Sequence, residues 1–269
     1  MPPAIWRTAA GLALFALFYT LLLLLWMVAV TPLLARALPG PQALTLLMLT
    51  SFATGLLALA LVMRLLHGQA LSRLLWPLPL TLRQGGRVLL YVLPLVAIIS
   101  LLPMPAEVTP VRHLPTGRWL ALLLPGLLAI AIQISAEECL FRGYLQGRLA
   151  GRFRSPLMWL VLPAALFGSL HYAPEAGDNA PWLVASATLF GLVAGDLTAR
   201  SGTLGPALAL HFINNVVAIL GVSFGDELGG LALFHLPITP DDPLLREMMP
   251  GDLATTGLLW LTARLALRR

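Results

Sequence analysis

The sequence predicts an all-α fold: a polytopic transmembrane helix bundle of about eight helices, with both termini on the cytoplasmic side. The chain of 269 residues is 58% hydrophobic and only 11% charged, and its mean hydropathy is +0.86. This composition is too apolar for a soluble globular domain. Eight apolar segments follow one another along the chain. The loops between them would alternate between the two sides of the membrane, and most of the arginines fall on one side.

The apolar segments define the expected elements, because a helix needs about 20 residues to cross the hydrocarbon region. The fourth segment is the longest, and the eighth is short. They span about residues 8–30, 44–66, 88–102, 119–149, 157–172, 182–199, 204–224 and 253–267. Residues 67–87 are expected at the inner interface and residues 225–250 in a long outer loop.

This pattern divides the chain into three expected parts. Residues 1–117 hold the first three helices and the interfacial segment. Residues 118–224 hold helices four to seven, and residues 225–269 hold the outer loop and the last helix.

Charge distribution sets the expected topology. All 17 basic residues are arginine, and the formal net charge is +5. With the N-terminus inside, twelve arginines fall in inner segments, and positive residues favour the cytoplasmic side. The four expected outside are Arg36, Arg112, Arg118 and Arg246. Because the arginines are spread between apolar segments, they indicate topology rather than nucleic-acid binding. We expect a multi-pass protein of a prokaryotic inner membrane, with membrane lipid as its surroundings.

The chain has a single cysteine, Cys139, so an intramolecular disulfide or a cysteine-based zinc site is excluded. A buried cysteine usually acts as a small apolar residue, and we expect that here. Asp196 and Arg200 are four residues apart on a predicted helix and are expected to pair.

Ionisable residues within apolar helices cost several kcal/mol unless they are paired or hydrated, which makes them candidates for function. The stretch SAEECLFRG carries three of them. Glu138 and Arg142 are four residues apart, on one helical face, and can pair. This pair has either a structural or a supporting role. Glu137 points about 100° away from Glu138 and needs another partner. The other candidates are His171, Asp196, His211, Asn214 and Asn215.

Depth along the helices relates Glu137 to the histidines. At about 1.5 Å per residue, Glu137 and His171 lie roughly 20 and 22 Å from the inner ends of their segments. His211 lies only roughly 10 Å from its end, and Asn215 roughly 16 Å. His211 and Asn215 share a helical face. A carboxylate beside an imidazole can act as a general base for water, and an imidazole with an amide can stabilise an oxyanion. The four residues therefore favour hydrolysis at a carbonyl group.

Three short motifs support this interpretation. They are EECLFRG at 137–143, FGSLH at 167–171 and HFINN at 211–215. They resemble, in order, the EExxxR, FxxxH and HxxxN motifs of the CAAX protease and bacteriocin-processing (Abi) family, which includes the Ras-converting type 2 CAAX prenyl proteases. The resemblance covers roughly residues 118–222. Cys139 stands where this family usually has phenylalanine.

The resemblance implies an intramembrane endopeptidase that acts on a hydrophobic or lipidated substrate. Glu137 would activate the water and His171 would orient it, while His211 and Asn215 would stabilise the oxyanion. Glu138 and Arg142 would support these residues, and Phe167 would pack against them. The family is often labelled as metalloproteases. We favour a site without metal; if zinc is bound, its expected ligands are Glu137, His171 and His211.

Two other functions remain open. A membrane scaffold or bacteriocin-immunity-type protein on the same fold would not need the complete set of motif residues, which this chain has. A transporter or proton pathway would need polar residues leading to the outer face. The first three predicted helices carry almost none.

Overall fold

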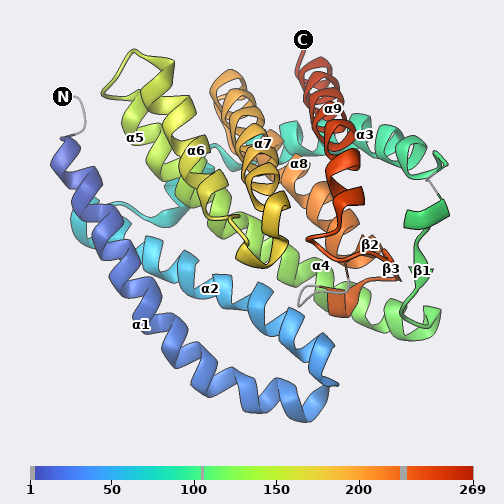
Figure 1. Cartoon of the computed structure of the whole chain (residues 1–269). Helices are drawn as coiled ribbons and strands as arrows, with labels where there is room; N and C mark the ends of the chain where they lie inside the picture. Colours follow the sequence, from blue (N-terminus) through green and yellow to red (C-terminus); the bar gives the residue numbers. More distant parts are fainter. Residues whose placement is uncertain (1–3, 104–105, 225–228, 269) are drawn as a thin grey trace.

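The fold is an all-α bundle in which eight helical segments follow one another through the part of the chain that the structure describes (Figure 1). The structure is a computed structural model, and it describes residues 4–103, 106–224 and 229–268. The predicted fold class and the number of helices are confirmed. Figure 1 shows both ends of the chain at the same edge of the bundle.

The first three helices are α1 (Ile5–Ala37), α2 (Gly40–His67) and α3 (Leu78–Ser100). The chain then enters α4 (Thr116–Glu138), which continues through the π-helical segment Cys139–Gln146 into α5 (Gly147–Ala150).

The remaining helices follow the same order as the predicted segments. A π-helical segment, Leu157–Val161, leads into α6 (Leu162–Ser169). Next come α7 (Ala180–Ser201) and α8 (Gly205–Asn215), which continues as the π-helical segment Val216–Gly221. The last helix is α9 (Pro243–Ala266). Short 3-10 turns occupy Leu71–Leu75, Ala106–Val108, Pro174–Asn179 and Gly229–Leu231.

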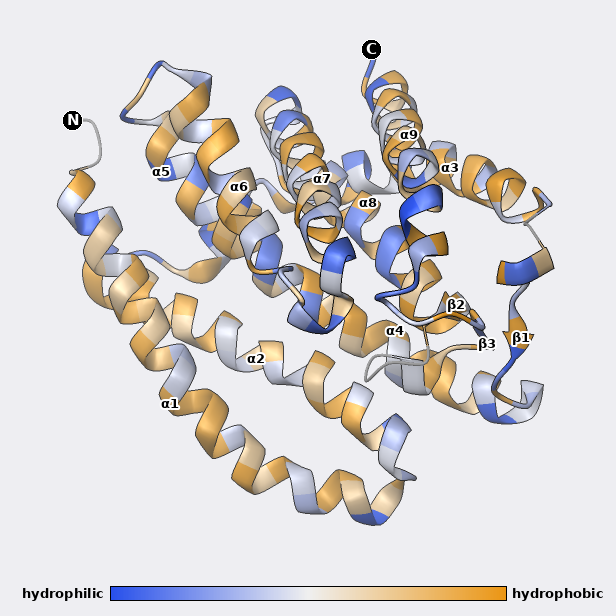
Figure 2. Ribbon diagram, in the orientation of Figure 1, coloured by the Kyte–Doolittle hydropathy of each residue, from blue (hydrophilic) through white to orange (hydrophobic). Residues whose placement is uncertain are grey.

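Five of the helices described are long and apolar enough to cross a membrane. They are α1, α2, α3, the helix formed by residues 116–150, and the one formed by residues 174–201. Residues 157–169 and 205–221 form shorter apolar helices. The protein is therefore a membrane protein by length and composition, and Figure 2 shows how strongly apolar α1 is along its length.

Two helices begin ten residues earlier than predicted. α3 begins at Leu78 and α9 at Pro243. A window of apolar residues misses these starts because the first turns are polar. In α3 the polar residues are used between helices: Gln84 donates to the Ser201 carbonyl at 3.2 Å and accepts from Thr203 Oγ1 at 2.6 Å. In α9 the Asp242 side chain caps the helix by accepting from the Leu244 amide.

The segment expected as a long outer loop is partly ordered, although residues 225–228 lie outside the described part. It contributes to a small sheet of three two-residue strands, β1 (Val111–Arg112), β2 (Val222–Ser223) and β3 (Phe234–His235). β3 lies in the middle, antiparallel to β1 and parallel to β2. The His113 and His235 rings stack beside it, with centroids 3.7 Å apart.

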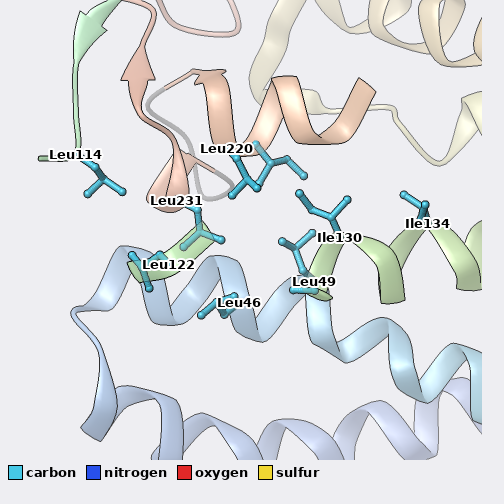
Figure 3. Packing of buried hydrophobic residues seen from close by; sticks show 10 residues of the cluster. Leu46, Leu49, Leu114, Leu122, Ile130, Ile134, Leu220 and Leu231 are labelled. Atoms are coloured by element: carbon cyan, nitrogen blue, oxygen red, sulfur yellow. The ribbon is translucent and has the colours of Figure 1, made fainter. Parts of the chain in front are cut away.

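One apolar cluster lies where α2, α4 and the segment after α8 meet (Figure 3). Leu49, Ile130 and Leu220 are among its buried members. Gly126 allows the close approach, because a Cβ there would lie 2.7 Å from Leu220 Cδ2. This packing fixes α4 in the centre of the bundle, which matters because α4 ends with the two glutamates.

α1 is the least embedded helix. It packs along α2, and only Thr8 and Gly11 are buried among its described residues. Most of its surface therefore faces outward (Figure 1).

Candidate active site

The centre of the site is an ion pair at the end of α4. Glu138 Oε1 accepts from Arg142 Nη1 at 3.0 Å, as the spacing predicted. The two side chains are 0% and 2% exposed. Phe167 packs over the Arg142 guanidinium, whose carbon lies 4.4 Å from the ring centroid. A buried charge pair of this kind needs both partners, because either one alone would be a buried unpaired charge.

His211 lies between the two glutamates. Its Nδ1 donates to Glu138 Oε1 at 2.8 Å, and its Nε2 lies 3.4 Å from Glu137 Oε2. This arrangement differs from the expectation that His211 faces an oxyanion, because both ring nitrogens face carboxylates. The prediction that Glu137 has a partner other than Arg142 is confirmed: that partner is His211.

Glu137 faces a cavity of about 570 Å³. Its side chain is 15% exposed, and its Oε2 is buried and accepts no hydrogen bond from the residues that the structure describes. Glu137 is thus partly open to the cavity, whereas Glu138 is fully enclosed, although Oε2 of each carboxylate accepts no hydrogen bond from the described residues.

His171 lines the same cavity, which agrees with the matching depths of the two residues. Its Nδ1 lies 2.9 Å from the Phe167 carbonyl oxygen. A carbonyl can only accept, so Nδ1 must carry the hydrogen. In the neutral ring Nε2 is then a hydrogen-bond acceptor, which fixes the tautomer in a form that can accept a hydrogen bond from water.

Asn215 belongs to a row of amides at the cavity. Its Nδ2 donates to Gln133 Oε1 at 2.7 Å, and its Oδ1 accepts from Asn214 Nδ2 at 3.2 Å. All three residues line the cavity. Gln133 was not predicted from the sequence, although a signal existed: it precedes Glu137 by four residues and so shares its helical face.

The other wall of the cavity comes from α1 and α2, and no pattern in the sequence predicted it. It is apolar except for one phenol, and its members are Phe15, Tyr19, Met48, Leu49, Phe52 and Gly55. Tyr19 stacks on Phe15 and lies over Gly55, where an added Cβ would be 3.6 Å from the ring. The cavity therefore has one polar and one apolar side.

The candidate metal ligands do not form a ready metal site. Among the residues described, no three His, Cys, Asp or Glu side chains are grouped as a metal ion would require. His171 and His211 bond to other groups through Nδ1, which leaves Nε2 as the ring nitrogen that could bind a metal, and His211 Nε2 lies against Glu137.

Glu138, Arg142 and His211 lie behind the cavity wall, and Cys139 and Asp196, also singled out in the sequence, do not line the cavity either. Cys139 is 2% exposed and packs within an apolar cluster, as expected. Asp196 pairs with Arg200, as the spacing predicted, with Nε–Oδ distances of 2.7 and 2.9 Å.

Comparison with known proteins supports the motif assignment. Residues 118–217 match the family model described as type II CAAX prenyl endopeptidase, Rce1-like. An uncharacterized protein of Bacillus subtilis (strain 168), YyaK, is 30% identical over 129 residues, which is 48% of this chain and 43% of that protein. The match thus spans less than half the length of the curated relative. No solved structure matches the chain significantly.

The matched segment contains all three motifs and every polar residue described above at the cavity, apart from Tyr19. The resemblance inferred from the motifs is thereby confirmed: residues 118–217 are similar to the Rce1-like, type II CAAX prenyl endopeptidase family.

Proposed function

We propose that the protein is an intramembrane endopeptidase that hydrolyses a peptide bond of a hydrophobic or lipidated substrate. The observation that carries the proposal is the contrast between the two glutamates. Glu138 is fully buried and bonds to Arg142 and His211, whereas Glu137 is 15% exposed and lines a cavity of about 570 Å³. A carboxylate held this way can serve as a general base.

In the proposed reaction, Glu137 takes a proton from a water molecule while the water oxygen attacks the carbonyl carbon of the substrate. His171 Nε2 accepts the water's other hydrogen bond and so orients the molecule. The C–N bond then breaks, and Glu137 returns the proton to the leaving nitrogen. The products are a carboxylic acid and an amine, so the atoms and the proton balance.

The oxyanion of the tetrahedral intermediate is assigned to Asn215. Its Nδ2 has two hydrogens, and Gln133 takes one of them. The second is available to an oxyanion, and a fixed amide donor of this kind stabilises developing charge. We assign His211 to the base rather than to the oxyanion, because its Nε2 lies against Glu137. Glu138, Arg142 and Phe167 hold His211 in place.

The apolar wall supports a hydrophobic substrate. Aromatic and aliphatic side chains from α1 and α2 form this side of the cavity, so a peptide segment or lipid chain can pack there without burying polar groups. We further propose that both termini face the cytoplasm of a prokaryotic cell and that the protein lies in its inner membrane, since this orientation agrees with the arginine distribution.

The test compares cells that produce the wild-type protein with cells that produce Glu137→Gln or His171→Ala. Mass spectrometry of membrane peptides should show one or more uncleaved precursors in the variant cells. With such a precursor purified, Glu137→Gln should lower the cleavage rate by about 10²–10⁴-fold, because it removes the general base.

Glu175→Gln is the matched control. It makes the same chemical change at an exposed position in the turn before α7, away from the cavity lining. It should leave cleavage unchanged. Identical sets of membrane peptides in wild-type and Glu137→Gln cells would reject the peptidase and favour a scaffold. All variants should reach the membrane in equal amounts.

A further inference from the structure

Asp196 is a carboxylate on an apolar helix for which the proposed reaction has no use. It accepts from Arg200 Nε through both oxygens, and its Oδ2 also accepts from Trp260 Nε1 at 2.9 Å. The Trp260 ring in turn lies under the Arg264 guanidinium, whose carbon is 4.8 Å from the ring centroid. A continuous line of contacts therefore joins α7 to α9 and holds two arginines in place.

A third helix adds to this cluster. Arg87 of α3 donates from Nη2 to the carbonyl oxygen of Arg268 at 3.1 Å. Arg87, Arg200, Arg264 and Arg268 thus belong to one cluster, in which the contacts of the described residues give one ion pair, that of Arg200 with Asp196. Like charges gathered in this way repel one another, and a bound anion would relieve the repulsion.

The cluster borders a hollow of about 540 Å³, which we call the arginine hollow. It is lined by Arg200, Arg264, Leu267 and Arg268. Figure 1 shows that α7 and α9 end at the same edge of the bundle as the C-terminus. The hollow therefore lies at the ends of membrane helices, on the side where the arginine distribution predicts the cytoplasm.

We propose that the arginine hollow binds the phosphate group of an anionic membrane lipid. Guanidinium groups fit phosphate oxygens with paired hydrogen bonds. Basic pockets at the cytoplasmic ends of membrane helices are suited to anionic headgroups. Leu267 provides an apolar side toward the acyl chains. Because Asp196 and Trp260 fix Arg200 and Arg264 beforehand, little side-chain freedom is lost on binding. This proposal does not depend on the peptidase assignment.

The experiment uses the full chain purified in detergent micelles and titrated with phosphatidylglycerol, with retained lipid counted by native mass spectrometry. Phosphatidylglycerol should be retained, and phosphatidylcholine, which has no net charge, should not. Arg264→Gln with Arg268→Gln should weaken retention about 30-fold, if each arginine near an anionic lipid contributes about a fivefold gain. Equal retention of the two lipids by the wild type would overturn the proposal.

Arg148→Gln with Arg152→Gln is the matched control. It removes the same charge near the end of α5, where these side chains lie over Tyr144 and Phe153 and not at the hollow. If both double variants retain phosphatidylglycerol equally weakly, the lipid is attracted by net charge alone. That result would overturn the proposal of a specific binding site.

Two further measurements separate the remaining outcomes. Trp260→Leu keeps every charge but removes the ring under Arg264 and the donor to Asp196, so it should weaken phosphatidylglycerol retention several-fold if the array is pre-ordered. Retention at the wild-type level would contradict that. Millimolar inorganic phosphate tests whether the hollow binds a free phosphate ion instead of the phosphate group of a lipid. If phosphate displaces the lipid fully, the hollow binds a free anion, and the proposal of a lipid ligand is overturned.

Discussion

The two walls of the cavity differ in how they are held. The polar wall comes from α4, α6 and α8, and the hydrogen bonds and ion pairs of Glu138, Arg142, His211 and Asn215 fix it. The apolar wall comes from α1 and α2 and is held by packing, with α1 buried only at Thr8 and Gly11 among its described residues. The polar wall also lies within the segment that matches the family, and the apolar wall lies outside it. The difference suggests that reaction chemistry and substrate choice reside in separate parts of the chain.

The strongest test of the polar wall is Arg142→Met. The change leaves Glu138 fully buried without its charged partner. We expect a loss of about 3–5 kcal/mol in the free energy of unfolding. Cleavage should be lost as well, because little of the protein would remain folded. Thermal unfolding in micelles measures the first effect.

A second variant separates the contribution of the Arg142 charge to stability from that of its packing. Adding Glu138→Gln to Arg142→Met removes the unpaired charge and keeps an oxygen for His211 Nδ1. The double variant should recover much of the lost stability. If it is as unstable as the single variant, the Arg142 side chain stabilises the fold by packing on Phe167 instead.

Gly55→Leu tests the apolar wall. A Cβ at Gly55 would meet Tyr19 and Ala136 at 3.6–3.8 Å, which is ordinary contact, so the rest of the leucine would fill the cavity. We expect a fall of about tenfold or more in kcat/KM for the precursor, since a blocked pocket excludes its substrate. Stability should change little.

The control for this change is Gly257→Leu on α9, where an added Cβ meets no atom within 4 Å. It should leave kcat/KM unchanged. Wild-type kinetics for Gly55→Leu would mean that substrate does not contact this wall.

Gln133→Met should have a smaller effect confined to the chemical step. The methionine fills similar space but cannot hold the Asn215 amide. We expect kcat to fall by about tenfold or less while KM stays the same, because only the orientation of an oxyanion donor is lost. Steady-state kinetics separates the two constants. A change in KM alone would instead place Gln133 in substrate binding.

The smallest expected effect lies outside the cavity, at His113. Burial, and secondarily the neighbouring His235, lowers the pKa of His113. The folded state therefore binds fewer protons than the unfolded state, and its stability falls as the pH drops below the usual histidine pKa of about 6.5. The protection factors of amides in the β1–β3 region, which correct for the slower intrinsic exchange at lower pH, should fall a few-fold between neutral and mildly acidic pH. His113→Phe keeps the ring stacking on His235 and should remove the part of this pH dependence that is due to His113.

Contacts within one helix were the most predictable part of the site. Glu138–Arg142 and Asp196–Arg200 follow directly from the spacing of four residues. The position of His211 was harder to predict. Depth along α8 placed it too shallow, because that calculation assumes that the helix begins at the membrane surface. Residues 203–207 are buried, so α8 begins inside the protein.

The apolar wall could not be predicted, for a different reason. No spacing rule relates Phe15 or Tyr19 to Glu137, since they lie on separate helices more than a hundred positions apart in the sequence. Gln133 is an intermediate case, because its helical face was predictable but its hydrogen bond to Asn215 depends on how α4 and α8 pack.

The π-helical segment Cys139–Gln146 makes the length of this stretch as important as its composition. A π-helical turn accommodates one more residue than an α-helical turn. If the same residues ran on as a regular α-helix, the surplus residue would turn everything after this segment by about 100°. Gln146, which donates to the Gly195 carbonyl at 2.9 Å, would then point away from α7. The number of residues between the two glutamates and Gln146 therefore fits a π-helical backbone and not an α-helical one.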